Sequence, residues 1–425
     1  MSSNDISIVS FWSRQISQIR ENGWVAVRFK VWKTISGLIG YALAVPLVLI
    51  ARLIRPLVWI RFGPVHARAL GHSIFDPVYY LCERELEPSR TVDCFYFDSR
   101  TVPNEQWALM VRRNLRINPV FRYADNVNRV FPRGELHHKS IKRTFAKDAE
   151  GYLARTEPHI TFSTVEDSKG RLFLKKLGIK PSARFVCLIV RDSAYKEKYA
   201  NPGSRKNWSY HDYRNSDIDT YKSAVMALAE KGYWVFRMGK AVHKPLKIDH
   251  PQIIDYANSG FRSDFLDIWL MANCYFTIST STGLDYVSVI YKKPILFINH
   301  LPILDCWTGS KDFTEYFKIL QWKKNGKYLS LRDQIACDAI NLSNKSDYDR
   351  LGITIIDNSS TQIENAVLDF EKKLSSNVTQ QRNKVLQEKF WNIMKEHKDF
   401  PKYHGKYSAN ISDVFLDEHH EWFLA

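Results

Sequence analysis

The order of apolar and polar positions in the N-terminal half of the chain predicts an open α/β layer. Short apolar runs at Leu57–Gly63 and Val92–Phe97 predict buried strands of a parallel sheet. The stretch Ala69–Pro77 predicts a loop between a strand and a helix, because proline is favoured in the first turn of a helix. A helix is predicted over residues 104–115, and this β-α-β-α succession is typical of an α/β fold.

A second set of elements begins after Gly178 and Pro181, which indicate the end of a predicted helix (168–177) and a linker. The clearest strand that follows is Arg184–Val190. Further strands are predicted at Tyr233–Met238, Ile253–Tyr256, Tyr275–Ile278 and Pro294–Asn299, and helices at 219–231, 265–272 and 284–291. Alternation at such short spacing predicts a doubly wound domain.

These patterns predict two Rossmann-like domains of an α/β protein, covering residues 56–180 and 181–375. They are preceded by a basic and hydrophobic N-terminal segment, residues 1–55. The remaining residues, 376–425, are expected to form a helical tail, with a helix at 378–397 and no clear strand.

The N-terminal segment contains an apolar stretch without a charge, residues 34–51, with Lys33 before it and Arg52 after it. Three interpretations are open: a monotopic segment lying in one leaflet, a single membrane span, or a buried core helix. The stretch is short for a span, which needs about 20 apolar residues, and no signal-peptide cleavage site follows it. Because basic flanks meet anionic headgroups, we expect contact with an anionic membrane surface, at the cytoplasmic face of the plasma membrane.

The overall charge restricts the possible partners. Lys and Arg number 61 against 45 Asp and Glu, a formal net charge of +16, which attracts polyanions such as anionic lipid, nucleic acid or phosphorylated small molecules. No zinc-finger spacing, RNP-like motif or dense basic run is present, so we expect no nucleic-acid partner. The six cysteines form no C-x-x-C pair, which argues against a zinc or redox site.

Chemistry is expected at the carboxyl ends of the strands in the C-terminal domain, where doubly wound sheets bind ligands. The turn Ser281-Thr282-Gly283 lies between a predicted strand and a helix, and its small residues would let backbone N–H groups approach a diphosphate. The same residues would also suit an ordinary helix cap. Cations and other polar residues are predicted near the same edge. Together with the turn they would form a binding site for a nucleotide diphosphate. The residues predicted to bind a nucleotide diphosphate, or the nucleotide sugar that the resemblance given below implies, are Arg191, Lys206, Arg214, Arg237, Gly239, Asp264, Ser281, Thr282, Gly283 and Asp285.

Together these stretches resemble a family of bacterial surface-polysaccharide glycosyltransferases with the two-Rossmann-domain GT-B architecture. The resemblance is carried by Tyr213–Tyr221, Val235–Gly239, Ser263–Trp269, Ser281–Asp285 and Lys293–Asn299. It extends over nearly the whole chain after about residue 55. It implies a sugar transfer from a nucleotide-sugar donor, and it does not specify the sugar or the acceptor.

More distantly, Ser281–Gly283 is similar to the Asp-Thr-Gly turn of heptosyltransferases, which binds the donor phosphates. Serine replaces the aspartate here, so only the phosphate role is carried over. The wider class inverts the anomeric centre without a metal and uses a carboxylate near the first strand–helix loop as the base. Asp76 lies in the corresponding region, with His72 four residues before it, and either side chain could accept the acceptor's proton. Asp76 could instead cap a helix ahead of Pro77.

The stretch Asp217-Ile218-Asp219 matches the metal-binding D-x-D pattern of another glycosyltransferase fold, but acidic residues are also favoured before a helix. We expect no metal, and no cofactor besides the nucleotide-sugar co-substrate. The chain has no Walker loop, G-x-G-x-x-G or G-x-S-x-G motif, which argues against an NTPase, a dehydrogenase or a serine hydrolase.

The sequence therefore predicts an inverting, metal-independent glycosyltransferase that acts on a surface-polysaccharide or lipid-linked glycan acceptor. One alternative is a nucleotide-sugar epimerase of the two-Rossmann type, against which the apolar N-terminal stretch weighs. Another is a non-catalytic, membrane-associated assembly partner in polysaccharide synthesis, against which the converging cations weigh.

Overall fold

The computed structural model describes residues 37–143, 147–199, 209–376, 383–404 and 409–425, together with 23–24, 27–28, 31–32 and 35. The chain packs as two compact units. Unit 1 comprises Met1–Val65, Ser89–Asp98 and Leu115–Ile141, and unit 2 comprises His66–Pro88, Ser99–Asn114 and Lys142–Ala425. The domain boundaries predicted at residues 55, 180 and 375 stay a prediction.

Unit 1 is built on two parallel strands, β1 (Trp59–Val65) and β2 (Thr91–Phe97), paired from Trp59 opposite Thr91 to Val65 opposite Phe97. Both predicted strands are confirmed, although β1 begins two residues later than expected. Helix α4 (Val120–Val130) and the short helix η1 (Gly134–His137) pack beside them.

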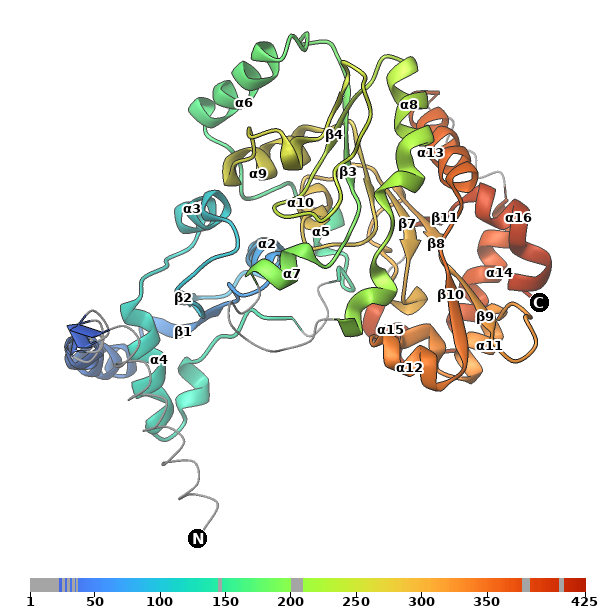
Figure 1. Cartoon of the computed structure of the whole chain (residues 1–425). Coiled ribbons are helices and arrows are strands. Elements are labelled where there is room, and N and C mark those ends of the chain that lie inside the picture. The colour runs from blue at the N-terminus through green and yellow to red at the C-terminus, as the bar shows by residue number, and fades with distance from the viewer. Residues whose placement is uncertain are drawn as a thin grey trace. The chain divides into compact units, whose positions relative to one another are not determined.

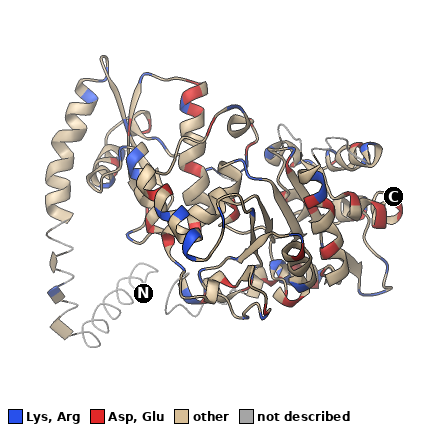
Figure 2. Ribbon diagram, turned by 90° about the horizontal axis from the view of Figure 1, so that it is seen from above, with Lys and Arg blue, Asp and Glu red and all other residues tan. Residues whose placement is uncertain are grey.

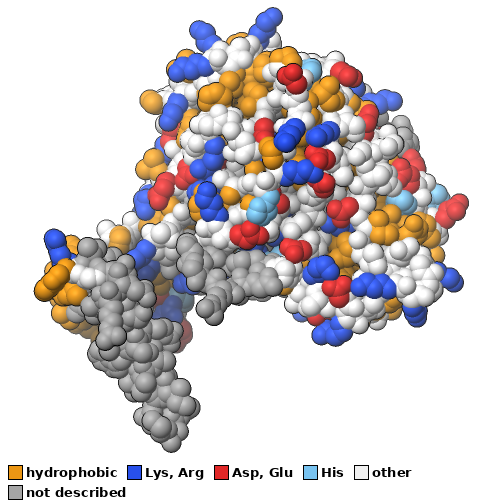
Figure 3. Space-filling model, viewed as in Figure 1, with side chains coloured by type: hydrophobic (Ala, Val, Ile, Leu, Met, Phe, Trp, Pro, Cys, Tyr) orange, Lys and Arg blue, Asp and Glu red, His pale blue; other side chains and the backbone are white. Residues whose placement is uncertain are grey.

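A helix at residues 37–53 also belongs to unit 1. It carries few charges and is tan along most of its length in Figure 2. Several of its large apolar side chains lie at the surface, where they contribute to the orange atoms beside the grey ones in Figure 3. No helix within the described part of the chain is long and apolar enough to cross a bilayer.

Unit 2 contains a seven-stranded sheet in which every neighbouring pair is parallel, in the order β11-β8-β7-β6-β3-β4-β5. The strands are β3 (Phe185–Ile189), β4 (Trp234–Arg237), β5 (Ile253–Ile254), β6 (Phe276–Ser279), β7 (Ile295–His300), β8 (Phe313–Phe317) and β11 (Asn410–Ile411). From β3 the chain first adds strands on one side and then, from β6, on the other. The predicted doubly wound domain is confirmed, and its strand order reverses between β3 and β6.

Helices cover both faces of this sheet, with α8 and α13 on one face and α9 and α10 on the other (Figure 1). The α-helices of unit 2 are α2 (Leu70–Leu86), α3 (Glu105–Asn114), α5 (Tyr152–Arg155), α6 (Thr164–Lys176), α7 (Ala194–Tyr199), α8 (Lys222–Glu230), α9 (Asp264–Asn273), α10 (Asp285–Ile290), α11 (Leu331–Ala336), α12 (Lys345–Arg350), α13 (Ser360–Ser375), α14 (Lys384–Met394), α15 (Phe400–Tyr403) and α16 (Asp413–Phe423). Short 3₁₀ helices are η2 (Ser209–Arg214), η3 (Ile218–Tyr221), η4 (Tyr256–Asn258), η5 (Ile303–Asp305) and η6 (Ala339–Asn341).

The predicted loop Ala69–Pro77 is wrong, because α2 already begins at Leu70 and carries Pro77 in its interior. An interior proline lacks the N–H that would bond to the carbonyl four residues earlier. That carbonyl belongs to Ser73, and it accepts instead from the buried indole N–H of Trp107 at 2.7 Å. The indole thereby replaces the missing backbone donor. Asp76 lies in the second turn of α2 and does not cap the helix.

The C-terminal tail also differs from expectation, because β11 joins the edge of the sheet beside β8. Two residues are too few to give an apolar run that the sequence pattern could reveal. The predicted helix at 378–397 is present as α14, and residues 377–382 lie outside the described part of the chain. A separate antiparallel pair, β9 (Ile319–Trp322) and β10 (Ile353–Ile356), was not predicted.

Candidate functional site

The candidate site lies where the strand order of the unit 2 sheet reverses. Arg191 follows β3 and Thr280 follows β6, and the Arg191 backbone N–H donates to the Thr280 hydroxyl at 2.9 Å. The carboxyl ends of the two strands are therefore tied together at the switch point. Ligands of doubly wound sheets bind in this position.

The turn that follows β6 is held by its own side chains. Ser281 adopts a positive φ of 58°, which is uncommon for a residue other than glycine. Its N–H donates to the Ser279 hydroxyl at 3.1 Å, and the Thr282 N–H donates to the Asp285 carboxylate at 2.6 Å. The Leu284 N–H donates to the Thr282 hydroxyl at 3.3 Å. The N–H groups of Ser281 and Thr282 thus stabilise the turn in this structure.

Asp285 stabilises the turn from a fully buried position. One of its oxygens accepts from Thr282 N–H and from the Ser279 hydroxyl at 2.7 Å, while the other, Oδ1, has no hydrogen-bond partner among the described residues. Burial raises the pKa of Asp285 to about 6, although its hydrogen bonds and the positive charges of Arg214 and Lys147 act in the opposite direction. The turn therefore contains a carboxyl group whose charge is poorly stabilised.

Two arginine side chains meet beside this turn. Arg214 donates through Nη2 to the Ser281 carbonyl, and its buried Nε has no partner among the described residues. Arg191 donates through Nη1 to the His211 carbonyl at 3.1 Å and to the Asn215 side chain. Burial, and next the charge of Arg214, lowers the pKa of Arg191 to about 10. Because the charge of Arg214 disfavours the cationic form of Arg191, an anion bound beside both arginines would be favoured.

The start of α2 meets the turn before α10 almost backbone to backbone. A Cβ atom added to Gly283 would lie 2.9 Å from the Gly71 nitrogen, and one added to Gly71 would lie 3.0 Å from the Tyr286 ring. Only glycine permits this approach. Helix α2 has neither a side-chain cap nor an acidic residue in its first turn, so the positive end of its dipole is not offset there. We call this contact the α2–α10 junction.

His72 and Asp76 lie one helical turn apart on α2, directly beside this junction. The His72 Nδ1 lies 3.2 Å from the Asp76 carboxylate. Asp76 is fully buried, whereas 28% of the His72 side chain is exposed. Burial raises the pKa of Asp76 even though its hydrogen bond to His72 lowers it. His72 is consequently the member of the pair that a bound molecule can reach.

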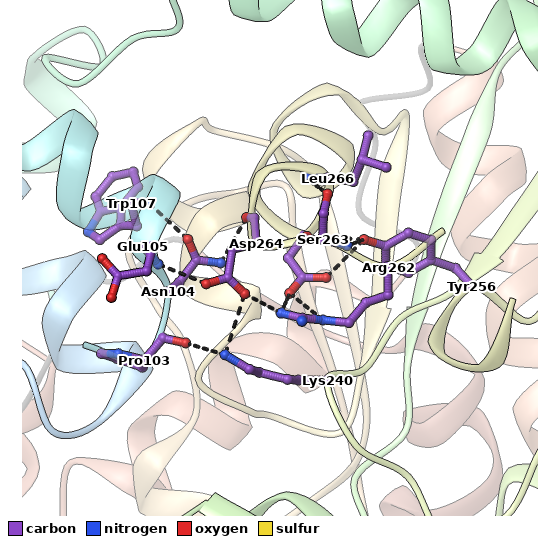
Figure 4. Close-up of polar contacts among 11 residues, drawn as sticks. Pro103, Asn104, Glu105, Trp107, Lys240, Tyr256, Arg262, Ser263, Asp264 and Leu266 are labelled. Atoms are coloured by element: carbon purple, nitrogen blue, oxygen red, sulfur yellow. Dashed lines mark hydrogen bonds and ion pairs between the residues drawn. The ribbon is translucent and has the colours of Figure 1, made fainter. Parts of the chain in front are cut away.

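A second junction joins the starts of α3 and α9 and is occupied by Asp264 (Figure 4). The Asp264 carboxylate accepts from the Glu105 N–H at 2.8 Å, and its other oxygen pairs with Arg262 and with Lys240 at 3.4 Å. The Asn104 amide donates to the Asp264 carbonyl at 2.8 Å. These partners hold the pKa of Asp264 below its usual value against the effect of burial. We call this contact the α3–α9 junction.

The remaining predicted donor residues lie apart from the turn. Arg237 is 1% exposed and donates to Asp255 at 3.4 Å and to the Lys244 carbonyl at 3.2 Å. Gly239 follows β4, and Lys206 lies outside the described residues. The structure thus brings Arg191, Arg214 and the 281–285 turn together with His72 and Asp76. It places Arg237 and Asp264 in separate networks of polar contacts.

Sequence reasoning missed Lys147, which contributes positive charge to the same region. Its ammonium group lies 4.1 Å above the Trp307 ring, donates to the Asp305 carbonyl at 2.5 Å and pairs with the Asp305 carboxylate at 3.3 Å. Its side chain is 5% exposed. The Asp305 carboxylate thus partners the charge of Lys147, which still acts on Asp285 in the neighbouring turn. No local pattern marks Lys147 in the sequence, because its partners lie about 160 residues further along the chain.

Among the described residues, no group of three His, Cys, Asp or Glu side chains could hold a metal ion. The carboxylates of the D-x-D stretch, Asp217 and Asp219, both pair with Lys244.

No protein-family model matches the chain, and no curated protein is similar to it in sequence. The solved structures that match are mainly glycosyltransferases. E. coli ADP-heptose LPS heptosyltransferase II is 12% identical over 56% of this chain and 84% of its own, with a TM-score of 0.32. A family 9 glycosyl transferase from Veillonella parvula is 11% identical over 56% and 80%, with a TM-score of 0.33. A UDP-N-acetylglucosamine 2-epimerase is 8% identical over 76% and 98%, with a TM-score of 0.25.

Proposed function

We propose that the chain is a glycosyltransferase of the two-Rossmann, GT-B type that transfers a sugar from a nucleotide-sugar donor. The observation that carries the proposal is the convergence of Arg191 and Arg214 with the uncapped start of α2 at the point where the strand order reverses. Two cations and a helix N-terminus provide the positive charge that a nucleotide diphosphate needs. Lys147 adds a third cation near Asp285.

Two residues on α2, His72 and Asp76, can accept the proton that such a reaction releases from the acceptor. In a transfer, the acceptor hydroxyl forms a bond to the anomeric carbon while the bond from that carbon to the diphosphate oxygen breaks. His72 accepts the proton that the hydroxyl loses, and Asp76 orients the imidazole by accepting from Nδ1. Arg191 and Arg214 stabilise the charge that develops on the leaving diphosphate. This assignment needs neither a metal nor a further cofactor and gives inversion at the anomeric carbon.

The acceptor we propose is a surface polysaccharide or a lipid-linked glycan precursor at the cytoplasmic face of the plasma membrane. The apolar and basic character of the N-terminal segment supports this part of the proposal.

The test is a thermal-shift screen of the purified full chain against UDP, GDP, CMP, ADP and their sugars. A ligand that binds only the folded state raises the melting temperature, by about 2–4 °C at a hundredfold excess over Kd. We expect one nucleotide family to do so, and Arg214→Gln to abolish the shift. Arg171→Ala is the matched control, because this arginine lies on α6 with 72% of its side chain exposed.

His72→Ala separates binding from chemistry. We expect it to keep the nucleotide-induced shift and to lower the transfer rate by about 10²–10⁴-fold, the usual contribution of a general base. A chain that shows no shift with any nucleotide, while remaining folded, would instead fit the non-catalytic assembly partner. Interconversion of a nucleotide sugar without any acceptor would identify an epimerase.

A further inference from the structure

The helix at residues 37–53 packs against unit 1 along one narrow stripe. Gly40, Ala44, Val48 and Ala51, spaced three or four residues apart, are its buried positions. Ala44, Val48 and Ala51 share a core cluster with Phe62 and with residues of β2 and α4. Residues at this spacing lie on one face of a helix. The helix is therefore fixed to unit 1 by small side chains on a single face.

Close contacts hold both ends of that face. Gly40 lies against the Tyr123 ring so tightly that an added Cβ would be 2.5 Å from it. At the other end, Arg52 donates to the Asn128 amide oxygen at 3.0 Å and to the Pro132 carbonyl. The packed face thus runs alongside α4 over more than three helical turns.

The opposite face is apolar and exposed, which reverses the usual pattern of a helix on a protein surface. Leu38, Leu43 and Ile50 are 66%, 59% and 54% exposed, and Leu53 is 81% exposed. Leu57, just beyond the helix, is 88% exposed. No charged residue interrupts residues 34–51. A continuous apolar surface of this kind marks contact with a membrane or another protein.

The surrounding charge decides between these two partners. Unit 1 carries 14 basic and 6 acidic side chains, a net charge of +8, which is half of the +16 of the whole chain. Arg28 and Arg55, one on each side of the helix, are exposed. Basic residues that border an apolar helix face complement anionic headgroups, whereas in contact with a second copy they would repel each other.

We propose that the exposed face of residues 38–57 inserts into the surface of an anionic lipid bilayer, with the helix lying in the plane of the membrane. A spanning orientation would require the helix to leave the stripe of contacts with Tyr123 and Asn128. In the plane, the buried stripe stays on unit 1 while the leucines enter the boundary between headgroups and acyl chains. This proposal concerns attachment and stands independently of the proposed sugar transfer.

The test is co-sedimentation of the full chain with vesicles of phosphatidylglycerol and phosphatidylethanolamine, compared with vesicles of phosphatidylcholine alone. We expect binding to the anionic vesicles that weakens with added salt. The triple variant Leu43→Glu, Ile50→Glu and Leu53→Glu should reduce the bound fraction by at least about tenfold, because three exposed apolar side chains that would enter the bilayer are replaced by charged ones. The matched control is Val165→Glu, Leu172→Glu and Val385→Glu, at similarly exposed positions of unit 2, and it should bind like the original chain.

Two results would overturn the proposal. One is equal sedimentation of the original chain with and without anionic vesicles. The other is a triple variant that keeps vesicle binding but changes from dimer to monomer in light scattering, which would assign the face to a second copy. Orientation is tested with tags at both ends of the chain: on sealed vesicles we expect external protease to remove both. Protection of the N-terminal tag alone would show a span.

Discussion

Two pairs of helix starts meet in unit 2, and their contents differ. At the α3–α9 junction, Asp264 lies between the two helix ends and pairs with Arg262 and Lys240. At the α2–α10 junction, Gly71 and Gly283 meet directly, and the nearby carboxylate of Asp285 accepts from the Ser279 hydroxyl and the Thr282 N–H of its own turn. The carboxylate at the first junction is paired with cations. Beside the second, α2 has no acidic residue in its first turn, and the hydrogen bonds of Arg191 and Arg214 among the described residues go to neutral oxygens.

This difference explains why we assign different roles to the charged residues at the two junctions. A carboxylate with a backbone N–H and two cations as partners is neutralised, and such a network stabilises a fold. Arg191 and Arg214, in contrast, donate mainly to neutral carbonyl and amide oxygens, so their charge is not cancelled at short range. We therefore expect changes at the α3–α9 junction to lower stability, and changes to Arg191 or Arg214 beside the α2–α10 junction to weaken ligand binding.

The largest effect is expected from Arg262→Ala at the α3–α9 junction. Arg262 pairs with Asp267 at 2.6 Å, and Asp267 is 4% exposed. Removing the cation leaves a buried carboxylate supported mainly by the Tyr256 hydroxyl at 3.1 Å. The free energy of unfolding should fall by about 3 kcal/mol, measured by urea denaturation.

Arg171→Ala provides the control for this change, since its pair with Asp167 on α6 lies largely in solvent. We expect the control to change the free energy of unfolding by less than about 0.5 kcal/mol. If Arg262→Ala and Arg171→Ala lowered the free energy of unfolding equally, the buried ion pair at the α3–α9 junction would be no more stabilising than the exposed pair on α6.

A smaller effect, with a distinctive pH dependence, is expected from Asp285→Asn. The pKa of Asp285 is raised from 3.8 to about 6 in the folded chain, so the folded state binds more protons between these values and Asp285 costs stability as the pH rises. Relative to Asp285→Asn, the original chain should lose about 2 kcal/mol of stability between about pH 4.5 and pH 7.5.

Asp264→Asn should show the opposite sign. The pKa of Asp264 is lowered, so its stabilising contribution is present above the ordinary pKa and is lost as the pH falls below about 4. Urea denaturation across the pH range would test both variants. If the pH dependence of stability changed in the same direction in Asp285→Asn and Asp264→Asn, the two carboxylates would not differ in the way that we propose.

Much of this arrangement could be predicted from the sequence, because it depends on local patterns. The buried strand Phe185–Ile189 and the turn at 281–283 are marked by an apolar run and by a glycine with hydroxyl residues. A parallel sheet brings the ends of its strands to one edge, so placing Arg191 near Ser281 required only the order of strands. The contact between His72 and Asp76 follows from their spacing once α2 forms, but the predicted loop at Ala69–Pro77 did not include that helical turn.

Other features depend on contacts between distant residues, and no pattern in one segment reveals them. The sequence could not show that Asp264 is bonded to the start of α3, because Glu105 lies 159 residues earlier. The start of α2 was placed too late because Pro77 is usually a first-turn residue. The helix accommodates Pro77 because the Trp107 indole donates to the Ser73 carbonyl that Pro77 leaves without a backbone partner.

The smallest predicted effect tests that indole, which links the two junctions. The backbone N–H of Trp107 donates to the Asn104 side chain at 2.8 Å, at the start of α3, while its indole bonds to Ser73 in α2. Trp107→Phe removes the indole donor and leaves the buried Ser73 carbonyl unpaired, at a cost of about 1–2 kcal/mol in urea denaturation. In a Pro77→Ala background the new backbone N–H can donate to the same carbonyl, so the cost of Trp107→Phe should fall by about 1 kcal/mol. An identical cost in both backgrounds would mean that packing of the ring alone, and not the hydrogen bond, joins α2 to α3.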